Sequence, residues 1–289
     1  MKLTLAAVLA LTITLLSCQK EPNVDLGTTP ASGGGNTNGL LVKAVAVTGS
    51  ETLTSLYGYD NQKRLETITM DGSSGGMQIH NYQKYARDNT GRITQIIQQV
   101  DNNGISSDTT VNNIHYPSAT SMDFDYSINI IGLSGYSVTD SSAYHYSAGK
   151  MTSIDSYLSA PLIGTSVMQN TRYDFSYDAS GRVSSQKIYN STTPSGPMVL
   201  VASETFTYGS VIEPSWYSTS ASQNYLINGL PQTSTNALSS LQVVNATDPT
   251  GNITVNLTYV LGAGNKPVSS TATTTGAQPQ VTKYTYFYQ

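Results

Sequence analysis

The side chains that could carry chemistry are few and scattered along this 289-residue sequence. His115 and His145 hold equivalent positions, because each directly precedes a tyrosine. If the two histidines stand on consecutive β-hairpins, their strands lie about 9.6 Å apart, at roughly 4.8 Å per strand. That separation is too large for two histidines to share one metal ion, and no third ligand occurs at a fixed spacing. We therefore predict no metal site and no cofactor.

Asp123 and Asp125 form the one pair of carboxylates that a hydrolase could use. Two residues apart on a strand, they would share one face. Glycosidases hold their two carboxyl groups about 5 to 10 Å apart, but on either side of the scissile bond. Side chains that point the same way rarely flank a bond, so we expect surface charges that discourage edge pairing. Neither a nucleophile elbow nor a phosphate loop occurs. The sequence favours a protein that is not an enzyme, with a glycan-acting hydrolase as a less favoured alternative.

The elements that would position these residues repeat along the chain. The segment 173–183 reads as a strand of alternating aromatic residues, a tight turn with glycine, and the start of a second strand. Weaker copies recur at a spacing of about 30 residues, a signature of repeat architectures. They centre on Tyr59, Arg87 (in place of a tyrosine), Tyr116, Tyr146, Tyr177 and Tyr208. Beyond Tyr208 an insert, 209–224, breaks the register, and we expect a degenerate copy at 225–231 and a further copy at Tyr259.

The alternation within each copy predicts the fold class. Side chains two apart share one face of a strand, so the aromatic residues gather on one face and small or polar residues on the other. We predict an all-β domain, an antiparallel meander of roughly six to eight hairpins forming a long curled sheet or a half-open barrel. A sheet folded over into two layers is the alternative. Almost no helix is expected, because no stretch after residue 17 has a sustained helical period.

The best-preserved copy is Tyr177-Asp178-Ala179-Ser180-Gly181-Arg182-Val183. It resembles the YD repeat of the RHS family, and the copies at 88–93 and 59–65 match it in part. The resemblance implies a strip of hairpins, which in large relatives winds into a shell around a toxin. This chain is too short for such a shell, and small lipid-anchored proteins with YD-like hairpins are the closer resemblance.

The N-terminus indicates where the protein is sent. A basic residue and a short apolar run predict a signal peptide over residues 1–17. The run ends in Leu15-Leu16-Ser17-Cys18, which resembles the lipobox of bacterial lipoproteins. The resemblance implies that Cys18 is lipidated, with palmitate among its acyl chains. We expect attachment to the outer membrane of a Gram-negative bacterium, on its periplasmic or its surface-exposed side. Residues 18–40 would be a flexible tether, and residues 41–289 the folded β domain.

Composition limits the partners. The net charge of −4 and the lack of basic runs argue against nucleic acid. The insert carries the only tryptophan, Trp216, beside Tyr217, and this pair could stack on a sugar ring. Alternatively, the insert covers one open end of the aromatic face. We expect a non-catalytic binding or display role, toward glycans or partner proteins, with a purely structural envelope protein as the alternative.

Overall fold

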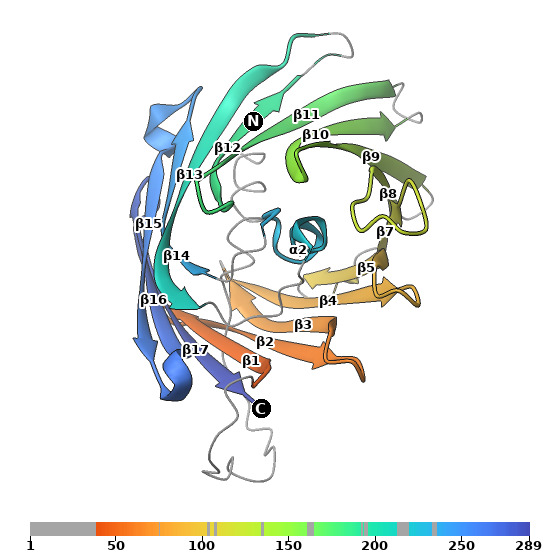
Figure 1. Cartoon of the computed structure of the whole chain (residues 1–289). Coiled ribbons are helices and arrows are strands. Elements are labelled where there is room, and N and C mark those ends of the chain that lie inside the picture. The colour runs from red at the N-terminus through yellow and green to blue at the C-terminus, as the bar shows by residue number, and fades with distance from the viewer. Residues whose placement is uncertain are drawn as a thin grey trace.

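The computed structural model describes residues 39–74, 76–102, 105–106, 109–133, 136–160, 165–191, 193, 196–212, 220–232 and 236–289. In this part of the chain, one antiparallel sheet curls until its two ends meet (Figure 1). Strands pair in sequence order, and the last strand pairs with the first. The architecture is a closed up-and-down β-barrel.

The first half of the wall comprises β1 (Leu41–Thr48), β2 (Glu51–Tyr59), β3 (Leu65–Ser74), β4 (Met77–Arg87), β5 (Ile93–Asn102), β6 (Ile105–Ser106), β7 (Thr110–His115), β8 (Tyr126–Leu133) and β9 (Tyr136–Ser147). The second half comprises β10 (Lys150–Ala160), β11 (Thr165–Tyr177), β12 (Val183–Asn190), β13 (Val199–Ile212), β14 (Asn236–Asn245), β15 (Ile253–Leu261), β16 (Pro267–Gly276) and β17 (Gln280–Tyr288). Because β6 is a short addition to β5, sixteen strands complete the ring. The predicted all-β antiparallel meander is confirmed.

The closure of the ring corrects the prediction of a half-open barrel. β1 pairs with β17 from Leu41 opposite Tyr288 to Thr48 opposite Thr282. An open strip would leave two rows of unpaired backbone groups, whereas closure removes both edges. Alternation within strands fixes which side chains face inward, but it does not state whether the two ends meet. The sequence therefore left open a question that the strand register answers.

The two faces of the wall have opposite character. Inward-facing side chains form one apolar cluster to which nearly every strand contributes, with tyrosine and phenylalanine prominent. The outward positions alternate with these and carry threonine, serine and charged residues, as expected from the sequence, together with exposed apolar residues such as Val260, Val281 and Phe287. Lys187 and Lys283, for example, each lie between two buried neighbours. The inward face is thus mainly apolar, and the outward face is mixed.

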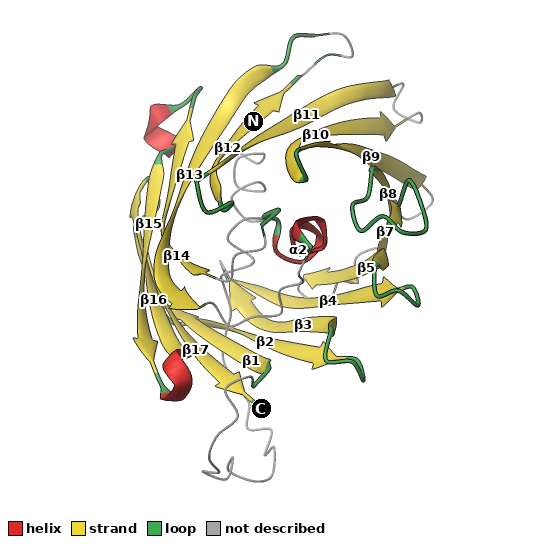
Figure 2. Cartoon of the chain, in the orientation of Figure 1, coloured by secondary structure: helices red, strands yellow, loops and turns green. Residues whose placement is uncertain are grey.

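One α-helix lies within the ring of strands (Figure 2). This helix, α2 (Ala221–Asn228), is 8 residues long, begins inside the predicted insert 209–224 and corrects the expected copy at 225–231. Two short 3-10 turns, η2 (Pro249–Gly251) and η3 (Ala263–Asn265), occur in strand connections. Among the described residues, the search for a helix long and apolar enough to cross a bilayer finds none.

Candidate functional site

The turns at one rim of the barrel share one hydrogen-bond pattern. In the turn from Asp88 to Arg92, one carboxylate oxygen accepts the backbone N–H groups of Thr90 and Arg92 at 2.9 and 3.1 Å. The other oxygen accepts the Arg92 Nε–H at 2.8 Å. Burial alone would raise the pKa of Asp88, but hydrogen bonds from Thr90 and Arg92 outweigh it and lower the pKa to about 2. The turns that begin at Asp60 and Asp178 have the same bonds.

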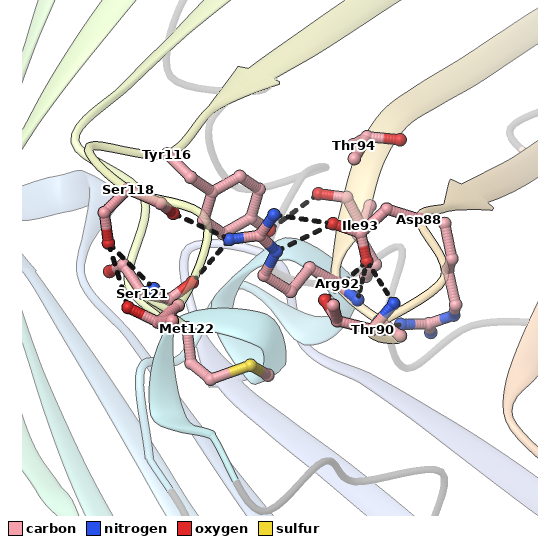
Figure 3. A network of polar contacts seen from close by, with 12 residues as sticks. Asp88, Thr90, Arg92, Ile93, Thr94, Tyr116, Ser118, Ser121 and Met122 are labelled. Atoms are coloured by element: carbon pink, nitrogen blue, oxygen red, sulfur yellow. Dashed lines mark hydrogen bonds and ion pairs between the residues drawn. The ribbon is translucent and has the colours of Figure 1, made fainter.

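Each turn is also joined to the next copy of the pattern. The Arg92 guanidinium lies 4.4 Å from the ring centre of Tyr116, and the Tyr116 hydroxyl donates to the Ile93 carbonyl at 2.7 Å (Figure 3). Arg182 and Tyr208 repeat this arrangement, with a hydrogen bond from Tyr208 to the carbonyl of Val183. The same arrangement occurs twice with a lysine as the cation, in the pairs Lys150–Tyr177 and Lys266–Tyr288. The motif residues therefore fix neighbouring hairpins to each other.

In the copy that lacks the tyrosine, an arginine makes the hydrogen bond to the neighbouring hairpin. Arg87 stands at the tyrosine position and donates through Nη2 to the Leu65 carbonyl at 3.1 Å. Leu65 follows the Asp60–Arg64 turn, just as Ile93 follows the next turn. A guanidinium can replace a phenol here because both are hydrogen-bond donors at the end of a long side chain. The rim residues are thus explained by structural roles.

The helix α2 begins and ends with ordinary caps. The Ser220 side chain accepts from the Gln223 N–H, and Gly229 adopts a left-handed conformation with φ of 76°. Asn228-Gly229 is also a hairpin signal, which is why the sequence suggested a turn between strands here. A left-handed glycine closes a helix equally well. The short pattern around Tyr225 does not distinguish the two outcomes.

Two buried glutamines attach the helix segment to the wall in equivalent ways. Gln223 accepts the Ile93 N–H at 2.9 Å and donates to the Tyr116 hydroxyl at 2.8 Å. Gln232 accepts the Val183 N–H at 3.2 Å and the Tyr208 hydroxyl at 2.8 Å. Both side chains therefore use the same pair of groups, in two different copies of the rim pattern.

Aromatic side chains surround the helix. The ring of Tyr225 makes edge contacts with Tyr144 at 5.9 Å and with Phe175 at 6.3 Å between centroids. Phe124 contacts Tyr144 in the same way at 4.5 Å. Burial raises the pKa of Tyr225 well above its usual value. Tyr225 nevertheless keeps an intermediate exposure, although it belongs to a helix inside the ring. Part of the barrel interior is therefore accessible to solvent.

Polar side chains face the same interior. Asn112, Asn129 and Asp140 share the inward face with the buried residues of their strands, and each has a buried Oδ1 atom without a hydrogen-bond partner among the described residues. Burial raises the pKa of Asp140 to about 6. Glu204 on β13 is 1% exposed and its Oε2 atom also lacks a partner in the described part. Burial raises the pKa of Glu204 to about 7.

The site residues predicted from the sequence differ in what the structure shows of them. Cys18, Trp216 and Tyr217 lie outside the described residues, so their roles stay predictions. His115 and His145 are exposed, as expected, and face Asp125 and Asp155 at 2.6 and 2.8 Å.

His80 is exposed too and pairs with Asp71 on the neighbouring strand. The search of the described residues for groups that could hold a metal ion finds none.

The prediction that Asp123 and Asp125 share one face of a strand is wrong. Both lie in the connection between β7 and β8. Asp123 accepts the Ser222 hydroxyl of α2 at 2.9 Å, whereas Asp125 faces His115. The prediction took Met122–Tyr126 as one strand, but β8 begins only at Tyr126, and residues 122–125 belong to the connection that contacts the helix. The two carboxylates therefore do not act on a common site.

Comparison with known proteins gives a fold and no family. No family model matches the sequence, and no curated protein is significantly similar to it. A porin-like protein from Bacteroides uniformis has a similar structure, with a TM-score of 0.51 at 14% identity, over 86% of this chain and 98% of that one. A porin-like protein from Bacteroides vulgatus gives a TM-score of 0.48 at 12% identity, over 87% of this chain and 99% of that one. At these identities the likeness is one of fold.

The sequence reading missed the interior acids and glutamines. Asp140 is in phase with Tyr144, and Glu204 is in phase with Phe206, so strict alternation places both on the apolar face. A carboxylate in phase with the aromatic residues is therefore a sequence signal that could have identified Asp140 and Glu204 as interior residues. Gln223 and Gln232 gave no comparable signal, because their function depends on the position of α2 inside the ring.

Proposed function

We propose that this protein is a lipid-anchored, non-catalytic binding protein of the bacterial cell envelope, and that its ligand enters the barrel. The observation that carries the proposal is the lining of the interior. Aromatic rings and buried oxygen atoms without a partner among the described residues line the interior, and Tyr225 and Asp140 there keep partial exposure. Aromatic faces with a few polar groups are typical of sites for organic ligands. Sugars, with hydroxyl donors and C–H faces, are one class that fits.

Charged pairs on the outer wall favour attachment through the N-terminus over insertion, although exposed apolar residues such as Val260 and Phe287 share that wall. Lys84 on β4 pairs with Glu66 on β3, and Arg172 pairs with Asp174 on β11, all on outward positions. Lipid-facing barrels carry an apolar outer band, and a lysine or arginine at the bilayer midplane costs about 2–4 kcal/mol. We infer that lipidated Cys18 holds the barrel beside the outer membrane, with the tether as spacer.

The insert after β13 is the second element of the proposal. Trp216 and Tyr217 belong to the segment between Ile212 and Ser220, directly before the helix that lies within the ring. A purely structural envelope protein is the alternative, and it predicts no ligand at all.

Replacement of Cys18 by alanine tests the anchor. We expect Cys18→Ala to lose its acyl label and to leave the membrane fraction, because the acyl chains on Cys18 are the proposed attachment. The measurement is metabolic labelling with a clickable palmitate analogue, followed by carbonate extraction. Ser17→Ala is the matched control and should retain the label. Continued acylation of Cys18→Ala, or its persistence in membranes, would refute the anchor.

Replacement of Trp216 by alanine tests the insert. We expect wild-type protein to bind members of a glycan array and Trp216→Ala to lose at least tenfold in affinity, which corresponds to the loss of about 1.4 kcal/mol of binding free energy. Tyr126→Ala, on the outer wall, is the control. Equal binding by all three proteins would remove the insert from the binding site, and no binding by any would favour the structural alternative.

A further inference from the structure

Three inward-facing side chains form a row across neighbouring strands. Asn112 on β7 is directly opposite Asn129 on β8, which in turn is directly opposite Asp140 on β9. Neighbouring strands are about 4.8 Å apart, and the inner surface of a barrel is concave, so the ends of these side chains converge. Each contributes an Oδ1 atom that is buried and has no hydrogen-bond partner among the described residues. The row thus offers three acceptors, one of them on a carboxyl group.

Among the described residues, no basic side chain of the wall balances the negative charge of Asp140 in this row. The basic side chains of the described strands either point outward or bond at the rim. Lys84 pairs with Glu66 outside, and Arg87 donates to carbonyl groups at the turns. The groups that face Asp140 electrostatically are the hydroxyls of Tyr144, Tyr173 and Tyr225. A buried carboxylate is costly unless a partner of opposite charge accompanies it.

We propose that Asn112, Asn129 and Asp140 bind the primary ammonium group of a small organic ligand inside the barrel. An ammonium group has three N–H donors and one positive charge, which match three oxygen acceptors and one carboxylate. The remainder of the ligand would lie against Tyr225, which keeps partial exposure and whose aromatic ring favours organic cations and their apolar parts. The inference rests on the proposed function, because it names the ligand class for the interior.

Matched pairs of compounds test the ammonium group. Titration calorimetry compares 2-phenylethylamine with 2-phenylethanol, and D-glucosamine with D-glucose, on the full-length protein at pH 7. We expect at least one amine to bind tenfold or more tightly than its hydroxyl analogue. Affinity should also fall at pH 5, where Asp140, with a pKa raised to about 6, is mostly protonated. If neither amine binds more tightly than its analogue, the inference is wrong.

Two substitutions test the site. Asp140→Asn should weaken amine binding at least tenfold, and Asn129→Ala should weaken it by removing one of the three acceptors. Asp174→Asn is the matched control, because Asp174 faces Arg172 on the outer wall at 2.8 Å. Amine binding that Asp140→Asn leaves unchanged would place the site elsewhere and overturn the inference. If glycans bind on the array but amines are not preferred over their hydroxyl analogues, the proposed ammonium site is wrong. The proposed function would still stand in that case.

Discussion

Replacement of Glu204 by glutamine is expected to stabilise the folded protein by about 3 kcal/mol at pH 8. Glu204 is 1% exposed, and burial raises its pKa from 4.5 to about 7. A shift of one pKa unit corresponds to about 1.4 kcal/mol, so a shift of this size amounts to roughly 3 kcal/mol. The glutamine keeps the shape of the side chain and removes the charge.

The sign of the effect follows from proton binding. Between pH 4.5 and about 7 the folded protein holds a proton on Glu204 that the unfolded chain releases. The free energy of unfolding therefore declines as pH rises through this window, and the loss is complete above it. Below pH 4.5 the carboxyl group is neutral in both states. The variant should thus match the wild type at pH 4 and exceed it at pH 8.

Urea unfolding at several pH values measures this difference directly. Other groups also titrate, but they cancel when the variant is compared with the wild type at each pH. Glu66→Gln serves as control, because Glu66 lies on the outer wall with its side chain 44% exposed beside Lys84. It should change stability by less than about 0.5 kcal/mol. A Glu204→Gln variant that is less stable at pH 8, or whose difference is independent of pH, would contradict the expected result.

Replacement of Gln223 by alanine is expected to cost about 2–3 kcal/mol and to loosen α2. Gln223 is 1% exposed, and its loss leaves the buried Ile93 N–H without an acceptor. An unsatisfied buried group costs about 1–3 kcal/mol, and the bond to the Tyr116 hydroxyl is lost in addition. Hydrogen exchange should show faster exchange in 221–228 than in the strands.

A substitution at the equivalent glutamine, Gln232, provides a second test of the same kind of contact. Gln232→Ala should have a similar cost, because Gln232 uses the same pair of groups at Val183 and Tyr208. Gln99→Ala is the control, since Gln99 is exposed on the wall and bonds Thr109 at 3.2 Å. If Gln223→Ala unfolds at the wild-type urea concentration with unchanged exchange in α2, the glutamine does not hold the helix.

The likeness to a porin-like fold and the polarity of the wall lead to different expectations. The ring of strands is similar to that of the Bacteroides uniformis protein. A membrane-spanning barrel has an apolar outer band, whereas the outer wall here carries Lys187 and Lys283 as well as exposed apolar residues such as Val260 and Phe287. The fold alone does not determine where the protein sits.

The sequence by itself determined the local structure and the two faces of the sheet. Alternation of tyrosine with small polar residues is a property of adjacent positions, so it predicts strands, their inward side and the turns that begin at Asp60, Asp88 and Asp178. The expected anchor at Cys18 and the binding pair Trp216 and Tyr217 also come from short stretches, and the described residues leave them as predictions.

Only the tertiary structure decided the closure of the ring, the placement of α2 and the grouping of the interior residues. β1 and β17 are at opposite ends of the described chain, and their pairing depends on the accumulated twist and register of every strand between them. The row of Asn112, Asn129 and Asp140 depends on strand register in the same way. Gln223 meets Ile93 only because an insert folds back into the ring. These contacts join residues that no local pattern relates, which is why the sequence reading placed the candidate site elsewhere.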